Sequence, residues 1–562
     1  MATSSLFTGE RAVLVIFVAR IIYLAPFSIL YESICLAILS ILAISVEISA
    51  DNHSSLLSQT FKTRPGASSG IFLGAVTLPG LMVSKLIQLS RALPFGEVGV
   101  EELEYLQVQY WVTSAICFSV VVFLFLVLFR QSCFSHYISS SWIISCICFY
   151  IGICCVCCYQ PSHGGWNAAI LLSWLSFHGL AAVKLIMHIL KTFPACASIG
   201  EALLVTSGLV AYLGDAFVYT ASKTHRYLPL STTVEIHYIS RSETSTIIQG
   251  MTIGLLVLPI FSKSILQVLE HLTFFPYPGV RADSGTRRSF VFYVSSAIFL
   301  VGVVPSWMEV VQNFQMHPFL WVFNFVFSEP SKSLSLCIYW LVLICASVVR
   351  FYKISKQSKL ERILLRKYYH LLAVLMFIPA LIFQPRFLDL AFGVAFAVFM
   401  LVEIIRVWRV WPLGQLVHQF MNAFTDHRDS DLLIVSHFSL LLGCALPIWL
   451  SSGFNDRPLA PFAGILSLGI GDTMASLVGH KYGVLRWSKT GKKTIEGTAA
   501  GITSVLAACS VLLPLLATTG YLLSKNLFSL ILAVTLSGLL EAYTAQLDNA
   551  FIPLMFYSLL CL

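Results

Sequence analysis

The sequence has very little charge for its length. Of its 562 residues, only 11% are Asp, Glu, Lys or Arg, whereas 57% are hydrophobic and the mean hydropathy is +0.83. Soluble globular domains carry about 25% charged residues. The composition therefore excludes an ordinary soluble protein and predicts a polytopic membrane protein.

Signatures of several other protein classes are missing as well. No Cys and His residues have zinc-site spacing, and no G-x-S-x-G segment marks a hydrolase nucleophile. Most of the fifteen cysteines lie in apolar runs, where cysteine behaves as a small hydrophobe. The first residues, MATSSLFTGE, lack the pattern of a cleaved secretory signal, so we expect the first span to be retained.

Long apolar runs dominate what is present. A membrane-crossing helix needs about 20 apolar residues, and by that criterion the chain holds about 15 candidate spans, including Leu459 to Val478 and a final long span from Leu527 to Leu547. Because open sheet edges are excluded from lipid, the expected fold class is all-α, a polytopic integral membrane protein.

Basic loops give the expected topology. The stretch 350–367, RFYKISKQSKLERILLRK, has seven basic residues and one acid, which places it in the cytosol by the positive-inside rule. Counting spans onward returns the basic stretch 481–493 to the same side, and brings Asp472, Glu496 and Asp548 near one membrane surface. We expect a membrane scaffold in 1–345 and a catalytic membrane region with a cytosolic nucleotide-binding loop in 346–562.

Polar signals concentrate in 469–501, GIGDTMASLVGHKYGVLRWSKTGKKTIEGTAAG. A carboxylate such as Asp472 near the end of a span is costly, so a functional role is its default interpretation, and Mg²⁺ favours one or two carboxylates plus substrate phosphates. Neighbouring glycines would let the backbone approach an anion closely; they are Gly469, Gly471, Gly479 and Gly483. The alternative is a tight contact between helices made by small residues, with Asp472 at its end.

The basic loop that follows has the residues that phosphoryl transfer needs. Lysine ammonium groups offset phosphoryl charge, and positioning and electrostatics carry most of that catalysis. The residues concerned are Lys489, Lys492, Lys493, Thr494, Glu496 and Gly497. A Walker loop is excluded because Arg486 stands where its first glycine belongs. A plain positive-inside loop would explain the lysines, but not Thr494 and Glu496.

The last long span ends LLEAYTAQLDN. Helical spacing predicts that Glu541, Thr544, Ala545 and Asp548 share one face. Paired acids at a membrane surface suit a divalent metal or activation of a hydroxyl. The alternative is interhelical hydrogen bonding and a solvated helix end.

Weaker signals accompany these. Lys367 and His370 lie in RKYYH at the start of another span on the same side, although such a histidine is more often structural. Asp215 and Asp389 have no second polar group beside them in the sequence, so we assign them to packing or helix ends.

Taken together, GIGDTMASLVGHKYGVLRW, KKTIEGT, EAYTAQLDN, RKYYH and the DLLIVSH to PIWL stretch resemble the eukaryotic dolichol kinases. The motifs fall in the expected order within about 350–562, while the first 345 residues match mainly in length and hydropathy. The resemblance implies an endoplasmic-reticulum membrane enzyme that phosphorylates dolichol with CTP on the cytosolic side, giving dolichyl phosphate for protein glycosylation. It also implies a nucleotide-binding segment from Lys481 to Gly497.

The resulting hypothesis assigns a role to each residue. Asp472 and Asp548 hold Mg²⁺ on CTP, Lys492 and Lys493 offset phosphoryl charge, and Glu541 or Glu496 positions or deprotonates the dolichol hydroxyl. The expected catalytic residues are Asp472, Lys492, Lys493, Glu496, Glu541 and Asp548, and the expected nucleotide contacts are Gly469, Gly471, Gly479, Gly483, Lys489, Thr494 and Gly497.

Three other functions remain open at this stage. A phytol or farnesol kinase, and a CTP-dependent lipid cytidylyltransferase, share a related signature but are generally shorter. A membrane transporter would use Asp472, Glu541 and Asp548 as an ion pathway, and would leave KKTIEGT without a purpose.

Overall fold

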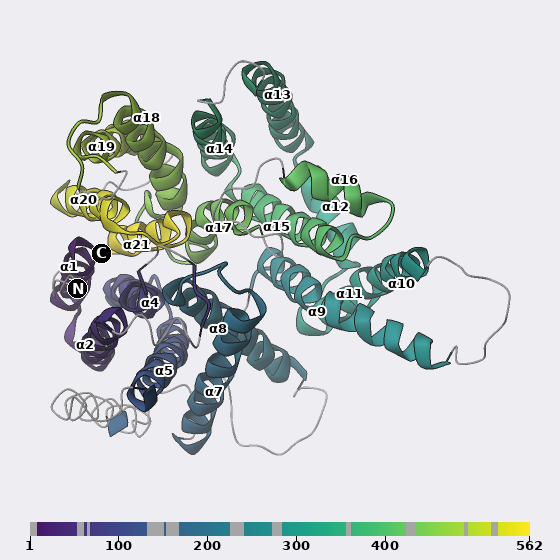
Figure 1. Cartoon of the computed structure of the whole chain (residues 1–562), viewed down its shortest axis with the longest axis horizontal. Coiled ribbons are helices and arrows are strands. Elements are labelled where there is room, and N and C mark those ends of the chain that lie inside the picture. Colours follow the sequence, from purple (N-terminus) through teal and green to yellow (C-terminus); the bar gives the residue numbers. More distant parts are fainter. Residues whose placement is uncertain are drawn as a thin grey trace.

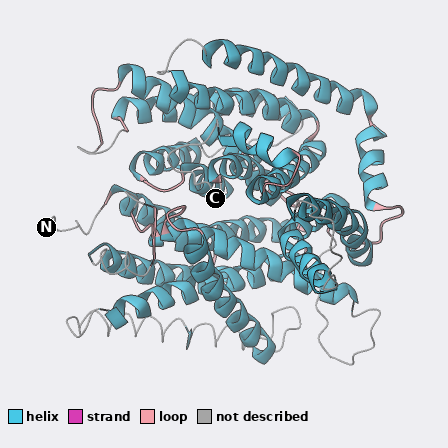
Figure 2. Cartoon of the chain, turned by 45° about the vertical axis from the view of Figure 1, so that its right-hand side comes forward, coloured by secondary structure: helices cyan, strands magenta, loops and turns pink. Residues whose placement is uncertain are grey.

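The computed structural model describes residues 8–52, 61–64, 68–131, 151–152, 168–224, 241–272, 284–355, 361–422, 434–487, 493–518 and 527–562. Throughout these ranges the regular structure is helical (Figure 2). The extended pairing found in the described ranges is an isolated bridge between Arg486 and Thr494. The all-α prediction is confirmed.

Apolar helices make up most of the molecule. Among the described residues, ten helices are long and apolar enough to cross a membrane, and five shorter apolar helices accompany them. This set agrees with the expected polytopic membrane protein. One of the candidate spans that the criterion of about 20 apolar residues gives, which starts near Trp142, lies outside the described residues.

The N-terminal elements form one side of the molecule in Figure 1. They are α1 (Gly9–Leu24), α2 (Leu30–Asn52), α4 (Ile71–Ala92), α5 (Val100–Gln131), α7 (Ala168–Thr192) and α8 (Ile199–Thr224). The chain then forms the arm at the right of that view, with α9 (Glu243–Leu272), α10 (Ser284–Ile298), η3 (Phe299–Val303) and α11 (Val304–Val311).

The remaining helices return toward the N-terminal side. They are α12 (Pro318–Ser328), α13 (Pro330–Ser355), α14 (Glu361–Phe383), α15 (Pro385–Trp408), α16 (Leu413–Asn422) and α17 (Val435–Leu450). After the 3₁₀ turn η4 (Ala460–Phe462) come the π-helix η5 (Ile465–Gly471), α18 (Asp472–Tyr482), α19 (Ile495–Thr518), α20 (Leu527–Tyr543) and α21 (Asp548–Cys561).

The two ends of the chain share one core. Helix α21 packs against α4 and α17, and α20 packs against α1. A single cluster of buried apolar side chains accordingly runs from Val13 to Leu562, and a second, smaller cluster joins α9, α10 and α15. Apolar side chains from both sides of residue 345 therefore belong to one cluster, and the division into scaffold and catalytic region at that residue stays a prediction.

The expected final span is wrong in its extent. Helix α20 ends at Tyr543, and Asp548 begins a separate helix, α21. The linker between them, 544–547, makes hydrogen bonds to the N-terminal side instead of continuing the helix; for example, Leu547 N donates to Glu201 at 2.7 Å. Glu541 and Asp548 therefore do not share one helix face.

The expected span from Leu459 to Val478 is helical, but it is not an α-helix throughout. Its middle is a π-helix, η5, and Asp472 is the first residue of the α-helix that follows. Such π-helical turns are rare and often mark functional sites.

Asp215 has polar partners that the sequence did not indicate. Arg241 lies 2.5 Å from its carboxylate, Gln109 donates to it at 3.1 Å, and Tyr105 also donates to it. This partly buried pair links α8 to the start of α9 and supports the assignment of Asp215 to packing.

A glycine contact brings the backbones of α17 and η5 together. A Cβ on Gly464 would overlap the carbonyl oxygen of Gly443, whereas a Cβ on Gly302 in η3 would meet open space. We expect Gly464→Ala to destabilise the protein by about 1–3 kcal/mol, because two backbones have to separate. Thermal melting of the detergent-purified protein measures this loss. Gly302→Ala is the matched control, and equal melting temperatures for the two variants would contradict the close contact.

Candidate functional site

Asp472 is the centre of the site. Its side chain is buried, and its Oδ2 accepts a hydrogen bond from Lys367 Nζ at 2.5 Å. His370 Nδ1 lies 3.1 Å from the same oxygen and 3.0 Å from Leu468 O. A lysine and a histidine from α14 therefore hold the buried carboxylate.

Local sequence explains how α14 reaches Asp472. Lys367 and His370 are three residues apart, so they lie on the same face of α14. A Cβ on Gly469 would overlap the side chain of Val374, which is also on α14. The absence of a side chain at Gly469 therefore allows η5, and Asp472 behind it, to approach α14 closely.

Two further acids surround this pair. Lys367 interacts electrostatically with Asp472, Asp548 and Glu541. Lys493 donates a hydrogen bond to the carbonyl oxygen of Glu541 and also interacts with its carboxyl group. We call Lys367, Asp472, Lys493, Glu541 and Asp548 the acid-lysine cluster.

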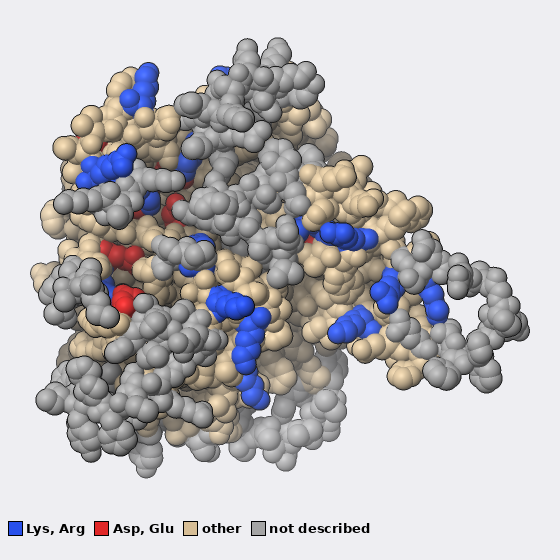
Figure 3. Space-filling model, viewed as in Figure 1, with Lys and Arg blue, Asp and Glu red and all other residues tan. Residues whose placement is uncertain are grey.

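The cluster joins four separate parts of the chain. Its residues come from α14, the start of α18, the basic loop before α19, and the two sides of the linker between α20 and α21. Figure 3 shows acidic side chains mainly over the region of α1, α20 and α21, while basic side chains lie both near them and elsewhere on the same face. Lys367 and Lys493, the last residues of the two basic stretches, thus lie at one site.

The carboxylates of the cluster are suited to a metal bound together with substrate phosphates. Both contacts of Asp472 use Oδ2, and within the described ranges no hydrogen bond reaches its Oδ1. No group of three or more His, Cys, Asp or Glu side chains that could hold a metal occurs in that part of the chain. One or two carboxylates suffice for Mg²⁺ when phosphates supply other ligands, and Asp472 with Asp548 meets that requirement.

Glu496 binds the backbone of the basic loop. Its carboxylate accepts hydrogen bonds from the backbone amides of Val484 and Leu485, at 3.1 and 2.9 Å. The side chain thus holds the basic loop against the start of α19. Lys489 and Lys492 lie outside the described residues.

The glycines of the motif make close helix contacts. A Cβ on Gly497 would lie 2.6 Å from Ala475 O, and one on Gly479 would lie 2.8 Å from Thr494 Oγ1; Gly471 and Gly483 are similarly close to Val505 and Thr494. Thr494 Oγ1 also accepts from Gly497 N at 3.2 Å, which caps α19. Packing between α18 and α19 accounts for this geometry, and nucleotide binding by these glycines stays a prediction.

A small pocket reaches the cluster from among η5, α19, α20 and α21. Its lining is mostly small or apolar and includes Gly501, Val505, Gly538 and Phe556, with Glu541 as its acidic residue. Among the residues that the structure describes, no hydrogen bond reaches the Glu541 carboxylate. A small, mostly apolar pocket with one acid in its lining is compatible with the hydroxyl end of a lipid alcohol.

Sequence reasoning gave too little weight to some residues and overlooked others. Lys367 and His370 contact Asp472 directly, and their spacing of three in RKYYH was the available signal. No comparable signal in the sequence indicated the residues that hold the linker 544–547, which are Arg64, Glu201 and Gln546.

Comparisons with known proteins agree on one family. The family model described as dolichol kinase matches residues 178–448. "Dolichol kinase EVAN" of Arabidopsis thaliana is 58% identical over 565 residues, covering 100% of this chain and 99% of the relative. The human "Dolichol kinase" is 34% identical over 397 residues, 68% of each chain. No solved structure gives a significant match.

These matches extend further than the motifs do. The motif resemblance begins near residue 350, whereas the family model begins at residue 178 and the Arabidopsis relative matches the whole chain. The N-terminal helices are therefore part of what these proteins share.

The contacts of Glu496 lead to a test of its role. We expect Glu496→Ala to accelerate tryptic cleavage after Arg486, because the amides of Val484 and Leu485 lose their acceptor and the loop loosens. Limited proteolysis of the purified protein measures the rate. Glu496→Gln keeps an acceptor oxygen and should cleave at the wild-type rate. Equal rates for all three proteins would show that the carboxylate does not hold the loop.

Proposed function

This chain belongs to the dolichol kinase family, and from that membership we propose that it transfers the γ-phosphate of CTP to the terminal hydroxyl of dolichol at the acid-lysine cluster. The observation that carries the proposal is the convergence of Asp472, Glu541 and Asp548 with Lys367 and Lys493 at one site. Phosphoryl transfer depends on such placed charges more than on covalent chemistry.

The donor side of the site is the basic loop with Asp472 and Asp548. Lys493, with Lys489 and Lys492 beside it in the sequence, offsets the charge of the triphosphate. Mg²⁺, held by Asp472 and Asp548, supplies charge neutralisation and orientation of the phosphates when bound. Lys367 fixes the Asp472 carboxylate through their hydrogen bond.

The acceptor side is the pocket that ends at Glu541. The dolichol hydroxyl enters this pocket while the polyprenyl tail remains among the apolar helices. Glu541 accepts the hydroxyl proton as the oxygen attacks the γ-phosphorus, the bond to the β-phosphate breaks, and CDP leaves. Glu541 suits this role better than Glu496, whose carboxylate is occupied by the amides of Val484 and Leu485.

The expected location is the endoplasmic-reticulum membrane, with the cluster facing the cytosol. The support is the positive-inside rule applied to 350–367 and 481–493, together with the contacts that Lys367 and Lys493, at the ends of these stretches, make in the acid-lysine cluster.

Labelled nucleotides test the reaction. Membranes carrying the protein, given dolichol, Mg²⁺ and γ-labelled CTP, should yield labelled dolichyl phosphate, and α-labelled CTP should leave the lipid unlabelled. Asp472→Ala should lower the rate by at least about a hundredfold, because the phosphates lose a charged anchor.

Asp389→Asn is the matched control for this prediction. Asp389 lies on α15 outside the cluster and should be replaceable without loss of transfer. Label transferred from ATP but not from CTP would contradict the donor assignment, and full activity in Asp472→Ala would contradict the site. Lipid labelled by α-labelled CTP would indicate cytidylyl transfer instead.

Accessibility tests the orientation. A protease site inserted after Gly483, in the loop between α18 and α19, should be cut by protease added outside intact microsomes. The same site inserted after Lys356, in the basic stretch 350–367, serves as a second reporter for the cytosolic face. Cleavage only after the microsomes are permeabilised would reverse the proposed orientation.

A further inference from the structure

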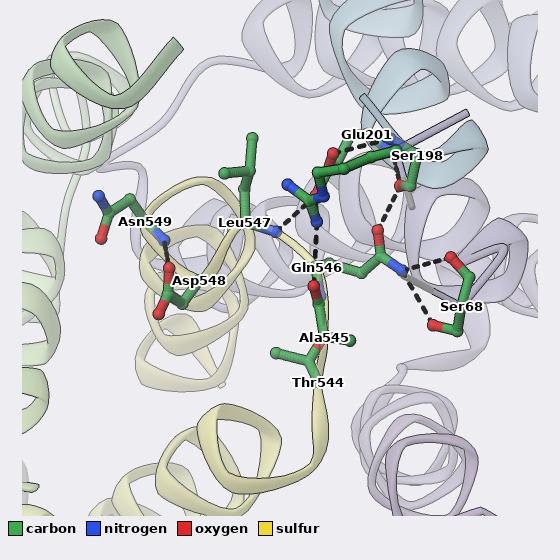
Figure 4. Close-up of polar contacts among 10 residues, drawn as sticks. Ser68, Ser198, Glu201, Thr544, Ala545, Gln546, Leu547, Asp548 and Asn549 are labelled. Carbon is green, nitrogen blue, oxygen red and sulfur yellow. Dashed lines mark hydrogen bonds and ion pairs between the residues drawn. The ribbon is translucent and has the colours of Figure 1, made fainter. Parts of the chain in front are cut away.

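The linker 544–547 is held by the N-terminal half of the chain. It connects Glu541, near the end of α20, to Asp548, the first residue of α21. Figure 4 shows its residues surrounded by polar side chains from the segments before α4 and at the start of α8.

Glu201 and Arg64 bind the backbone of this linker. Glu201 Oε1 accepts from Leu547 N at 2.7 Å and from Arg64 at 2.8 Å, while Arg64 also donates to Ala545 O at 3.0 Å. Both side chains are more than nine-tenths buried. The buried ion pair of Arg64 and Glu201 therefore binds the amide of Leu547 and the carbonyl of Ala545. In a continuous helix these two backbone groups would bond to other backbone groups instead.

Gln546 anchors the same linker through its side chain. Its Nε2 donates to Ser68 O and Ser68 Oγ, each at 3.0 Å, and its Oε1 accepts from Ser198 Oγ. The side chain is 1% exposed. It fits because Gly70, at φ +63°, has no Cβ where the amide lies.

These contacts fix the position of Asp548. Leu547 is the residue before α21, so the hydrogen bond from its amide to Glu201 fixes the start of that helix and the carboxylate on its first residue. Asp548 in turn interacts with Lys367, which binds Asp472. A chain of contacts thus runs from α8 through the linker to the acid-lysine cluster.

We propose that Arg64, Glu201 and Gln546 are positioning residues that hold the 544–547 linker so that Asp548 and Glu541 both face Lys367 and Asp472. The proposal rests on the phosphoryl-transfer function assigned to the cluster. It gives the N-terminal helices a part in the geometry of the site besides packing. No group in the network touches the substrate, and its effect passes through Asp548.

A double-mutant cycle tests the proposal. We expect Glu201→Gln and Gln546→Met each to lower kcat/KM for Mg²⁺-CTP about tenfold to a hundredfold, since small displacements of a catalytic group cost this much. In an Asp548→Asn background the same changes should add little, because the group they position is already altered. Full-length protein in lipid nanodiscs gives the four rates.

Ligand binding provides a second readout. Thermal stabilisation of each variant by CTP with Mg²⁺, compared with CTP alone, reports on the carboxylates without turnover. The metal-dependent part of the stabilisation should shrink in Glu201→Gln and in Gln546→Met, and should be equally small when either is combined with Asp548→Asn.

Asp215→Asn is the matched control. It breaks a partly buried ion pair of the N-terminal half, that with Arg241, and should lower the melting temperature while leaving kcat/KM at the wild-type value. The proposal would be overturned if Glu201→Gln or Gln546→Met lowered kcat/KM by the same factor in the Asp548→Asn background as in the wild-type protein. It would also be overturned if the Gln546→Met protein were less stable but equally active. Wild-type turnover with ATP alone would instead contradict the proposed donor, and the cycle would then be run with ATP.

Discussion

The buried pair between Lys367 and Asp472 is the constraint on which the site depends. A carboxylate that is 4% exposed needs a charged partner, and removing one member of such a pair typically costs about 3–5 kcal/mol. The pair requires α14 and η5 to be in contact, and Gly469 permits that contact. The contact between α14 and Asp472 therefore depends on three features together. They are the π-helical turn, the glycine, and the spacing of three between Lys367 and His370.

The N-terminal half also contains buried charges that have charged partners. Its buried charges are mostly paired with each other, as in Arg11 with Glu47 and Arg64 with Glu201. Some side chains of these pairs also form hydrogen bonds with backbone groups that lie far along the chain. An apolar environment offers no water to such groups, so side chains have to satisfy them.

Composition and local patterns predict a large part of this arrangement. The scarcity of charge indicates membrane helices, and the positive-inside rule brings Asp472, Asp548 and the two basic loops to one surface. These features depend on local hydropathy and charge, which a sequence displays directly. The cluster found in the structure contains four of the expected catalytic residues: Asp472, Lys493, Glu541 and Asp548.

The features that escaped prediction depend on distant partners. Nothing in EAYTAQLD breaks a helix, since it has no glycine or proline, yet α20 ends at Tyr543. Beyond this end, the amide of Leu547 binds Glu201, which lies 346 positions away. Glu496 is similar, because only the folded loop shows that amides of Val484 and Leu485 occupy its carboxylate. The motif glycines were ambiguous, since close approach to an anion and close approach to a helix need the same lack of a side chain.

The packing of α21 against α4 also determines how late in synthesis the fold can be completed. Ser84 and Ser558 share a buried hydrogen bond of 2.6 Å across 474 positions of the chain. Because synthesis begins at the N-terminus, α4 is made long before its partner α21. Contacts between such distant segments form slowly, so this protein gains its active arrangement only after nearly all of the chain has been inserted.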